Sequence, residues 1–268
     1  MGMNRTRFLL VVASALASIV SSSQVRGQED RSSAFDVHRG GVVMTFDDRN
    51  FDDWVNTIPL FDEFGVKATF FISGKIDDHA VDAIRRLRKH GHAIGSHSVH
   101  HLKAVEYCQD HSPEVFLRNE IRPQLEAFQA AGVAPTSFAY PMSRNDAVTD
   151  ETLLKVFRHL RTGKNVADGE RICDADAFFV PAGRINQQGC LIAKGIDYAP
   201  ARPDRTFEQI DAALTRAAEN HEIIVFYAHR ICATKPDRGH FVTPEALAQI
   251  FGKAKQLNLP FYTFDQLP

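Results

Sequence analysis

Residues 41–48 read GVVMTFDD, an unbroken apolar run that ends in two adjacent carboxylates. Such a run is typical of a strand buried on both faces, as in a parallel sheet. A carboxylate buried without a partner costs free energy, so two in tandem at a strand end favour a metal or a substrate as their partner. A helix N-cap explains one of the two Asp residues equally well, but it leaves the second without a role.

Outward from this stretch, apolar strand patterns alternate with helix patterns. Further strands are predicted at 68–72, 92–95, 136–140, 159–162, 178–180, 223–228 and 261–264, and helices at 54–64, 79–90, 113–131, 151–157, 206–220 and from 244 onward. The alternation predicts an α/β fold, a distorted (β/α) barrel of about seven parallel strands with outer helices. An open doubly wound sheet is the alternative, although its usual Gly-rich turn is missing after the first strand.

Chemically active side chains follow several of these strands. They are Asp47, Asp48, His97, Tyr140 and His229. In a parallel barrel, the positions after the strands gather at one rim, where enzymes of this architecture carry their sites. These residues are therefore expected to converge, although they are far apart in the sequence.

A pair of histidines four residues apart, His97 and His101, is compatible with a metal site. On a helical turn this spacing puts both rings on one face, whereas His100 points elsewhere. With one carboxylate of residues 47–48, the pair gives three ligands and leaves an open position for an activated water. Two nitrogen ligands and one oxygen suit Zn²⁺ best, with Co²⁺, Fe²⁺, Mn²⁺ and Ni²⁺ as alternatives. The second Asp is then free to take a proton from the water, and His229 is a candidate to protonate the leaving group.

Three segments in order carry a specific family pattern. TFDD (45–48), KATFFI (67–72) and IGSHSVHH (94–101) together resemble the polysaccharide deacetylase family, the NodB homology domain of carbohydrate esterase type. The resemblance extends over nearly all of the chain from residue 41 to residue 266. It implies a distorted (β/α) barrel and a metal-dependent hydrolase of carbon–nitrogen bonds that removes acetyl groups from N-acetylated sugars.

The resemblance also assigns separate roles to the strand-end residues. It implies that Asp47 is the general base, and that the metal ligands are Asp48, His97 and His101. His229 matches the general acid of the family, which protonates the departing amine.

The segment FAYP (138–141) resembles the third motif of the family, which forms a wall of the substrate groove. Tyr140 and Pro141 are accordingly expected to bind substrate, and the backbone N–H of Met142 is expected to stabilise the oxyanion. Tyr140 and Tyr227, which lie beside motif positions, are expected to line the groove, because their rings can pack while their hydroxyls reach substrate.

The chain departs from the family pattern at several places. Arg49 follows the Asp pair where many members have Gly-Pro. The tryptophan of the fourth motif has no clear counterpart, since Trp54 is better explained as core or loop. Ala139 replaces an arginine that orients the base in many members. Arg184, in PAGRI (181–185), is the candidate that supplies this charge to the catalytic site from another strand.

The N-terminus has the features of an export signal. Two arginines precede an apolar run at 8–20 and small residues follow it, so residues 1–27 are predicted to be a signal peptide, with cleavage after 22 or 23 as alternatives. Residues 28–39 are expected to be a disordered polar leader, and residues 40–268 the catalytic domain. The protein is therefore expected to be secreted, periplasmic or at the cell surface, without stable membrane insertion after cleavage. An uncleaved anchor is the alternative, although the apolar run is short for a membrane span.

Export would place the cysteines in an oxidising compartment, where the four can form two disulfides in one of three pairings. They are Cys108, Cys173, Cys190 and Cys232. Cys173 and Cys190 flank one short segment and are the preferred pair.

The formal net charge of −2 and the lack of a basic run argue against a nucleic-acid partner. The expected partner is an acetylated glycan. An O-acetyl esterase or a non-sugar amidase with the same residues is an alternative, as is a carbohydrate-binding barrel that has lost catalysis. A purely structural barrel would leave the strand-end residues unexplained.

Overall fold

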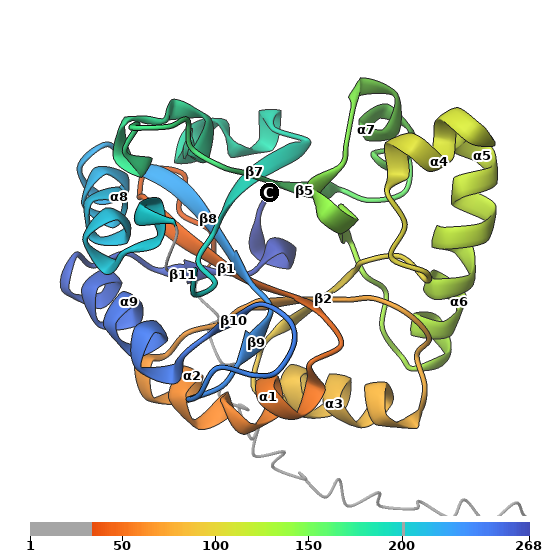
Figure 1. Cartoon of the computed structure of the whole chain (residues 1–268), viewed down its shortest axis with the longest axis horizontal. Coiled ribbons are helices and arrows are strands. Elements are labelled where there is room, and N and C mark those ends of the chain that lie inside the picture. Colours follow the sequence, from red (N-terminus) through yellow and green to blue (C-terminus); the bar gives the residue numbers. More distant parts are fainter. Residues whose placement is uncertain (1–33, 200–201) are drawn as a thin grey trace, which may run out of the picture. The chain divides into compact units, whose positions relative to one another are not determined.

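Seven parallel strands close into a barrel at the centre of the structure (Figure 1). This computed structural model describes residues 34–199 and 202–268. The barrel strands are β1 (Gly41–Asp48), β2 (Thr69–Ile72), β3 (Ala93–Ser96), β4 (Ser137–Ala139), β5 (His159–Lys164), β7 (Cys190–Gly195) and β8 (Glu222–Ala228). Because β8 pairs back onto β1, the predicted barrel is confirmed and the open sheet is excluded.

Short additional strands distort the barrel. β11 (Phe261–Tyr262) pairs with the start of β1 and β2 pairs with its end, so two strands share one edge of β1. β6 (Phe179–Pro181) runs antiparallel to the first residues of β8. β9 (Arg230–Ile231) and β10 (Phe241–Val242) form a separate parallel pair that follows β8 along the chain.

Helices cover the outside of the barrel (Figure 1). They are α1 (Phe51–Asn56), α2 (Ile58–Phe64), α3 (Asp78–Lys89), α4 (Ala104–Asp110), α5 (Pro113–Phe116), α6 (Arg122–Ala130), α7 (Ala147–Leu153), α8 (Phe207–Glu219) and α9 (Pro244–Gln256). Short 3-10 turns lie at Pro141–Ser143, Ile172–Asp174, Asp176–Phe178, Ala182–Gln187, Pro203–Arg205 and Phe264–Gln266. Within the described ranges, no helix combines the length and the apolar character needed to cross a membrane.

Alternation along the strands separates two of the three apolar clusters among the described residues. One fills the barrel interior and includes Val43, Phe71, Ala139, Leu191 and Val225. The other lies between the strands and the helices and includes Met44, Phe46, Phe70, Phe226 and Phe251. Because successive side chains of a strand point to opposite faces, Asp47 shares the inward face of Val43 and lies at the mouth of the barrel.

The helix expected at 113–131 is interrupted by a π turn at Leu117–Ile121. The N–H of Arg122 donates to the carbonyl of Leu117, five residues back. In a regular helix the ring of Pro123 would clash with the carbonyl four residues back, and the wider turn avoids this clash. The helix expected at 54–64 is likewise divided into α1 and α2, which meet at Thr57.

Four of the described helices and strands were not expected from the pattern: α4, the barrel strand β7 and the short strands β9 and β10. Lys194 interrupts the apolar run of β7, so the sequence of this strand resembles that of a loop. In the structure this ammonium group is buried, and it lies 2.6 Å from a carboxylate oxygen of Asp204. An ion pair thus allows a charged residue inside a central strand.

The predicted signal peptide, residues 1–27, lies outside the described residues. The end of the leader is ordered, contrary to the expectation. The ring of Phe35 packs on that of Tyr262 with centroids 4.7 Å apart, and the N–H of Asp36 donates to the Tyr262 hydroxyl at 3.3 Å. The leader therefore contributes an aromatic contact to the barrel.

All four cysteine thiols, which lie in the described part of the chain, are free, so the preferred disulfide is wrong. Cys190 begins β7 next to the amide of Asn145. Cys173 lies in a 3-10 turn whose backbone accepts a hydrogen bond from Arg216 on α8. The chain between the two cysteines passes through β6, which carries them to different parts of the barrel.

Candidate active site

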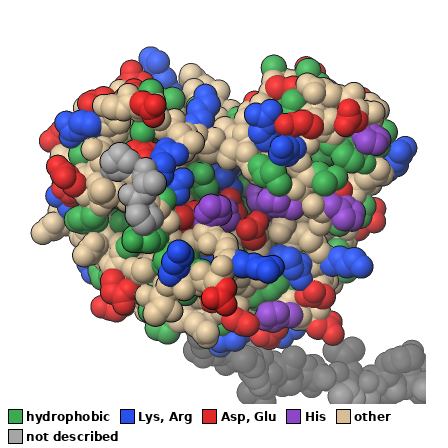
Figure 2. Space-filling model, viewed as in Figure 1, with side chains coloured by type: hydrophobic (Ala, Val, Ile, Leu, Met, Phe, Trp, Pro, Cys, Tyr) green, Lys and Arg blue, Asp and Glu red, His purple; other side chains and the backbone are tan. Residues whose placement is uncertain are grey.

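A cleft of about 380 Å³ opens at the rim formed by the carboxyl ends of the barrel strands. It is lined by Asp47, Asp48, His97, His101, Tyr140, Met142, Ser143, Tyr227, His229 and His240. Figure 2 shows histidine and acidic side chains gathered in a hollow of this face. The structure thus brings the strand-end residues together.

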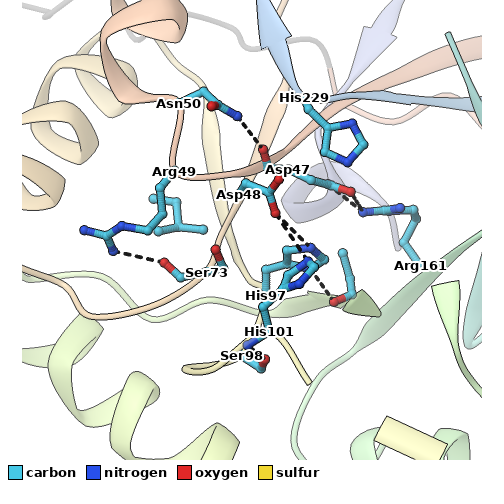
Figure 3. Close-up of polar contacts among 12 residues, drawn as sticks. Asp47, Asp48, Arg49, Asn50, Ser73, His97, Ser98, His101, Arg161 and His229 are labelled. Atoms are coloured by element: carbon cyan, nitrogen blue, oxygen red, sulfur yellow. Dashed lines mark hydrogen bonds and ion pairs between the residues drawn. The ribbon is translucent and has the colours of Figure 1, made fainter. Parts of the chain in front are cut away.

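Asp48, His97 and His101 form a group that can hold a metal ion, since one ligand atom from each lies within 4.8 Å of the others. Oδ1 of Asp48 is 3.7 Å from Nε2 of His97 and 3.3 Å from Nε2 of His101 (Figure 3). Nδ1 of His97 donates to the carbonyl of Ala139 at 2.7 Å, which leaves Nε2 free as a ligand. Burial lowers the pKa of His97 to about 4, so the ring is neutral, as a metal ligand must be. Two imidazoles, one carboxylate and an open side toward the cleft fit Zn²⁺ or a similar divalent ion.

The histidines approach each other through a turn of the backbone, and the helical turn expected for residues 97–101 is wrong. Ser98 and His101 have φ values of 60° and 56°, and Asp48 has a φ of 85°. Such left-handed conformations cost non-glycine residues about 1–3 kcal/mol each and persist where the surroundings hold them. The Ser98 hydroxyl accepts the His101 N–H at 3.1 Å, and the two rings lie with centroids 4.9 Å apart.

Asp47 is paired with a buried arginine that the sequence interpretation missed. Asp47 is 3% exposed, and Nη2 of Arg161 on β5 lies 2.6 Å from its Oδ1. Burial works to raise the pKa of Asp47, but the charge of Arg161 outweighs it, so the pKa lies below its ordinary value. Asp47 is therefore an anion that can accept a proton. The guanidinium also lies over the rings of Phe71 and Tyr227, at 5.3 and 5.0 Å.

His229 is paired with Asp197, a second residue that the sequence interpretation missed. Nδ1 of His229 lies 2.8 Å from Oδ2 of Asp197, and the backbone N–H of His229 donates to Oδ1 at 3.0 Å. Burial works to lower the pKa of His229, but the hydrogen bond and the charge of Asp197 outweigh it and raise the pKa to about 9. The imidazole is therefore protonated at neutral pH. The buried indole N–H of Trp54 also donates to the carbonyl of His229 at 2.8 Å, so Trp54 is a core residue.

Residues 36–159 match the sequence profile described as polysaccharide deacetylase. The resemblance to the polysaccharide deacetylase family is confirmed. The chitin deacetylase of Arthroderma benhamiae is 39% identical over 66 residues, which are 23% of this chain and 18% of that protein. Matches to the two curated relatives span 18% and 24% of their lengths, so most of each relative lies outside the match.

Solved structures of polysaccharide deacetylase type share the barrel. The chitin deacetylase of the fungal pathogen Colletotrichum lindemuthianum has a TM-score of 0.56 at 17% identity, with 86% of this chain and 88% of that chain covered. The Xyl-CE4 domain of a multidomain xylanase from the hindgut metagenome of Trinervitermes trinervoides has a TM-score of 0.52 at 17% identity, over 85% of this chain and 89% of that chain. At this identity the likeness establishes the fold alone.

The charge beside Asp47 comes from Arg161 on β5, and not from position 139 on β4, where the family resemblance led us to look for it. Ala139 on β4 and Arg161 on β5 are register partners, and both side chains lie inside the barrel, as the Asp47 carboxylate does. The expectation that Arg184 supplies this charge is wrong. Arg184 is exposed in the turn after β6, which pairs with the first residues of β8 and therefore lies at the opposite rim. An arginine within the predicted strand 159–162 was the available signal.

Arg49, another departure from the deacetylase pattern, points away from the cleft (Figure 3). Its guanidinium donates to the carbonyl of Ser73 at 3.0 Å and pairs with the carboxylate of Asp77 at 2.7 Å. Arg49 therefore connects the end of β1 to the start of α3 and does not line the cleft.

One wall of the cleft follows β4 in the segment FAYP (138–141) and the turn after it. Met142 and Ser143 have φ values of 53° and 55°, so this turn is another place where left-handed backbone is held at the site. The Ser143 hydroxyl accepts the N–H of Gly163 at 3.0 Å. The expectation that the hydroxyl of Tyr140 reaches substrate is wrong, because this buried group donates to Asp150 on α7 at 2.7 Å. Tyr140 contributes its ring to the wall.

The opposite wall is formed by Tyr227 and His240. A Cβ atom at Gly163 or Gly195 would lie 2.8 or 2.9 Å from the ring of Tyr227, so these glycines make room for it at the barrel mouth. His240 directly precedes β10, and its ring centroid lies 5.2 Å from that of His229. No local pattern in the sequence pointed to His240, since it follows a loop without a recognisable motif.

Proposed function

We propose that this protein is an exported, metal-dependent deacetylase that hydrolyses the N-acetyl groups of a polysaccharide or oligosaccharide. One observation carries the proposal. A three-residue metal-ligand group, an anionic Asp47 and a protonated His229 line the same cleft. The signal-peptide pattern of residues 1–27 supports export, and the chitin deacetylase among the relatives supports an N-acetylated glycan as substrate.

In this mechanism Asp48, His97 and His101 hold the metal. When bound, a divalent ion, most suitably Zn²⁺, supplies Lewis-acid polarisation of the acetyl carbonyl and acidifies water. Asp47 accepts the proton of the attacking water, and Arg161 keeps this carboxylate anionic and oriented. The backbone N–H of Met142 stabilises the negative charge that develops on the carbonyl oxygen.

The second half of the reaction needs an acid. His229 donates its proton to the sugar nitrogen as the carbon–nitrogen bond breaks, which gives acetate and a free amino sugar. Asp197 keeps the imidazole protonated and fixes its orientation through Nδ1, so Nε2 is the donor. The Asp47 and His229 pairs thus have the opposite protonation states that the two roles require.

Two alternatives use the same cleft. An O-acetyl esterase would use the same base and metal. Because one structural neighbour is a domain of a multidomain xylanase, the test below includes an O-acetylated xylan as a substrate. A glycan-binding barrel without catalysis would not require the Arg161 and Asp197 partners, which favours the enzyme.

Acetate release from the zinc-loaded protein tests the proposal. Substrates are acetylated glucosamine oligomers, peptidoglycan, an N-acetylated exopolysaccharide and O-acetylated xylan. Asp47→Asn should remove release from the N-acetylated substrates, whereas the same change at the exposed Asp82 on α3 should leave it unchanged. Release from xylan alone would indicate the esterase, and glycan binding without release would indicate the binding barrel. Full activity of Asp47→Asn would contradict the mechanism.

A further inference from the structure

Gln124, on α6, joins chain segments around the proposed metal ligands from behind the cleft. Its side chain is buried, with 1% exposed. The amide Nε2 lies 3.0, 3.1 and 2.9 Å from the carbonyl oxygens of Ile72, Gly74 and Ser98, so its two N–H bonds are shared among three acceptors. Its Oε1 accepts the hydroxyl of Ser96 at 2.6 Å. One side chain therefore binds the ends of β2 and β3 and the loop that carries the histidines.

The segment that follows β2 links the ligands on its two sides. The N–H of Ser73 donates to the carbonyl of Asp48 at 3.1 Å, and the N–H of Gly74 donates to the carbonyl of Ser98 at 2.9 Å. Ser73 and Ser98 both lie close to the ligand group in Figure 3. Gln124 bonds to this segment and to the histidine loop at once, so it sets how far apart they lie.

Glu120, one turn earlier, holds the same loop at a second point. It is also 1% exposed, and its Oε2 accepts the backbone N–H of His100 at 2.8 Å. Its backbone carbonyl accepts the N–H of Val99 at 3.2 Å. Glu120 belongs to the π turn at 117–121, and such turns occur frequently at functional sites. The interrupted helix thus presents two buried polar side chains to one loop.

We propose that Gln124 is a positioning residue of the metal site, and that Glu120 is the second anchor of residues 97–101. The proposal deepens the proposed function and rests on it only in requiring a metal at this site. The loop contains left-handed backbone at Ser98 and His101, which surrounding contacts must hold in place. Groups that orient ligands in this way affect metal affinity although they do not touch the ion.

Gln124→Met tests the proposal, because methionine has a similar length and removes both the donor and the acceptor. Zn²⁺ affinity is measured by competition with a chromophoric chelator, and Co²⁺ absorption spectra report the coordination geometry. We expect the affinity to fall about 10- to 100-fold and the spectrum to change, in a protein that still unfolds cooperatively without metal. Gln129→Met, an exposed change on the same helix, is the matched control. Wild-type affinity and spectrum in folded Gln124→Met would overturn the proposal.

Ser96→Ala is a milder variant for the case in which Gln124→Met does not fold. It removes the hydroxyl that orients the Gln124 amide, and the expected loss of Zn²⁺ affinity is about 2- to 10-fold, the equivalent of one hydrogen bond. Ser137→Ala on the adjacent strand is its control, since that buried hydroxyl has no hydrogen-bond partner within the described residues. Equal affinities of the two alanine variants would also overturn the proposal.

The test separates this inference from the proposed function. A wild-type protein that binds Zn²⁺ without releasing acetate would refute the deacetylase activity and leave the role of Gln124 intact. An active enzyme whose Gln124→Met variant keeps its affinity would do the reverse.

Discussion

Replacing Asp197 with asparagine removes the charge that keeps His229 protonated. In the wild-type protein the pKa of His229 is raised to about 9. Without Asp197, burial still works to lower this pKa and only the charges of Asp47 and Asp48 oppose it, so the pKa should fall to about 6.5, the ordinary value for histidine, or below. The drop of about 2.5 units corresponds to about 3.4 kcal/mol. At pH 7.5 the protonated fraction of His229 would then fall from about 97% to about 9%, so roughly tenfold less of the acid is available.

The pH dependence of kcat/KM for acetate release measures this effect. Activity should fall as pH rises through the pKa of His229, because deprotonation removes the acid. In Asp197→Asn the basic limb should move to lower pH by about 2.5 units, with a loss of roughly tenfold or more at pH 7.5. Both enzymes are loaded with metal, so the charge of the ion acts on both and the difference reports Asp197. Asp168→Asn, an exposed change on the loop after β5, should keep the wild-type profile.

Two results would refute this reasoning. One is a basic limb in Asp197→Asn that coincides with that of the wild type. The other comes from NMR titration of the metal-free protein, in which His229 should be half-protonated near pH 9. A midpoint near 6.5 in the wild type would show that Asp197 does not control the proton.

Further outcomes concern stability and metal dependence. Because folding raises the pKa of His229, protonation of this residue should stabilise the fold fully below about pH 6.5, and the stabilisation should be lost as pH rises through about 9. The measurement is the free energy of urea unfolding, which should fall over this pH range relative to that of Asp197→Asn. Arg161→Met leaves Asp47 buried without its cation and should lower the free energy of unfolding by about 3–5 kcal/mol. Arg161→Ala combined with Ala139→Arg should recover part of this loss. An unchanged free energy of unfolding in Arg161→Met would contradict the pairing. Dialysis against a chelator should abolish acetate release until Zn²⁺ is returned, and Zn²⁺ at 100 times its Kd should raise the free energy of unfolding by about 2.7 kcal/mol; activity that survives metal removal would refute the metal dependence. Gly195→Ala should cost about 1–3 kcal/mol by crowding Tyr227, while Gly252→Ala, in the open middle of α9, should be neutral or stabilising; equal effects would refute the close approach.

Much of the barrel could be predicted because its signals are local. The run at 41–48 is apolar up to the two carboxylates that end it. In a parallel barrel, the residues at the carboxyl ends of the strands lie at the same rim. Asp47, Asp48, His97 and His229 needed only this rule to be brought together.

The partners of these residues could not be predicted, because they depend on register. The local sequence does not indicate that Arg161 on β5 is the register partner of Ala139 on the adjacent strand β4. An arginine that points into the barrel looks like a surface residue in the sequence until the neighbouring strand is placed. Asp197 follows β7, which was itself missed because Lys194 interrupts the apolar pattern and its partner Asp204 is ten residues away. The spacing of His97 and His101 suggested the right pair for the wrong reason, since left-handed backbone brings them together.

The pairing of Ala139 with Arg161 has a consequence for comparing relatives. Ala139 and Arg161 are register partners on adjacent strands, and both side chains lie inside the barrel, so an arginine can move from one strand to the other while the carboxylate that it serves stays in place. A linear motif records such an exchange as a loss, although the electrostatic environment is conserved in space. Relatives that lack the third-motif arginine should therefore be sorted by the residue opposite it on β5, and those with small neutral residues at both positions are the ones expected to be inactive.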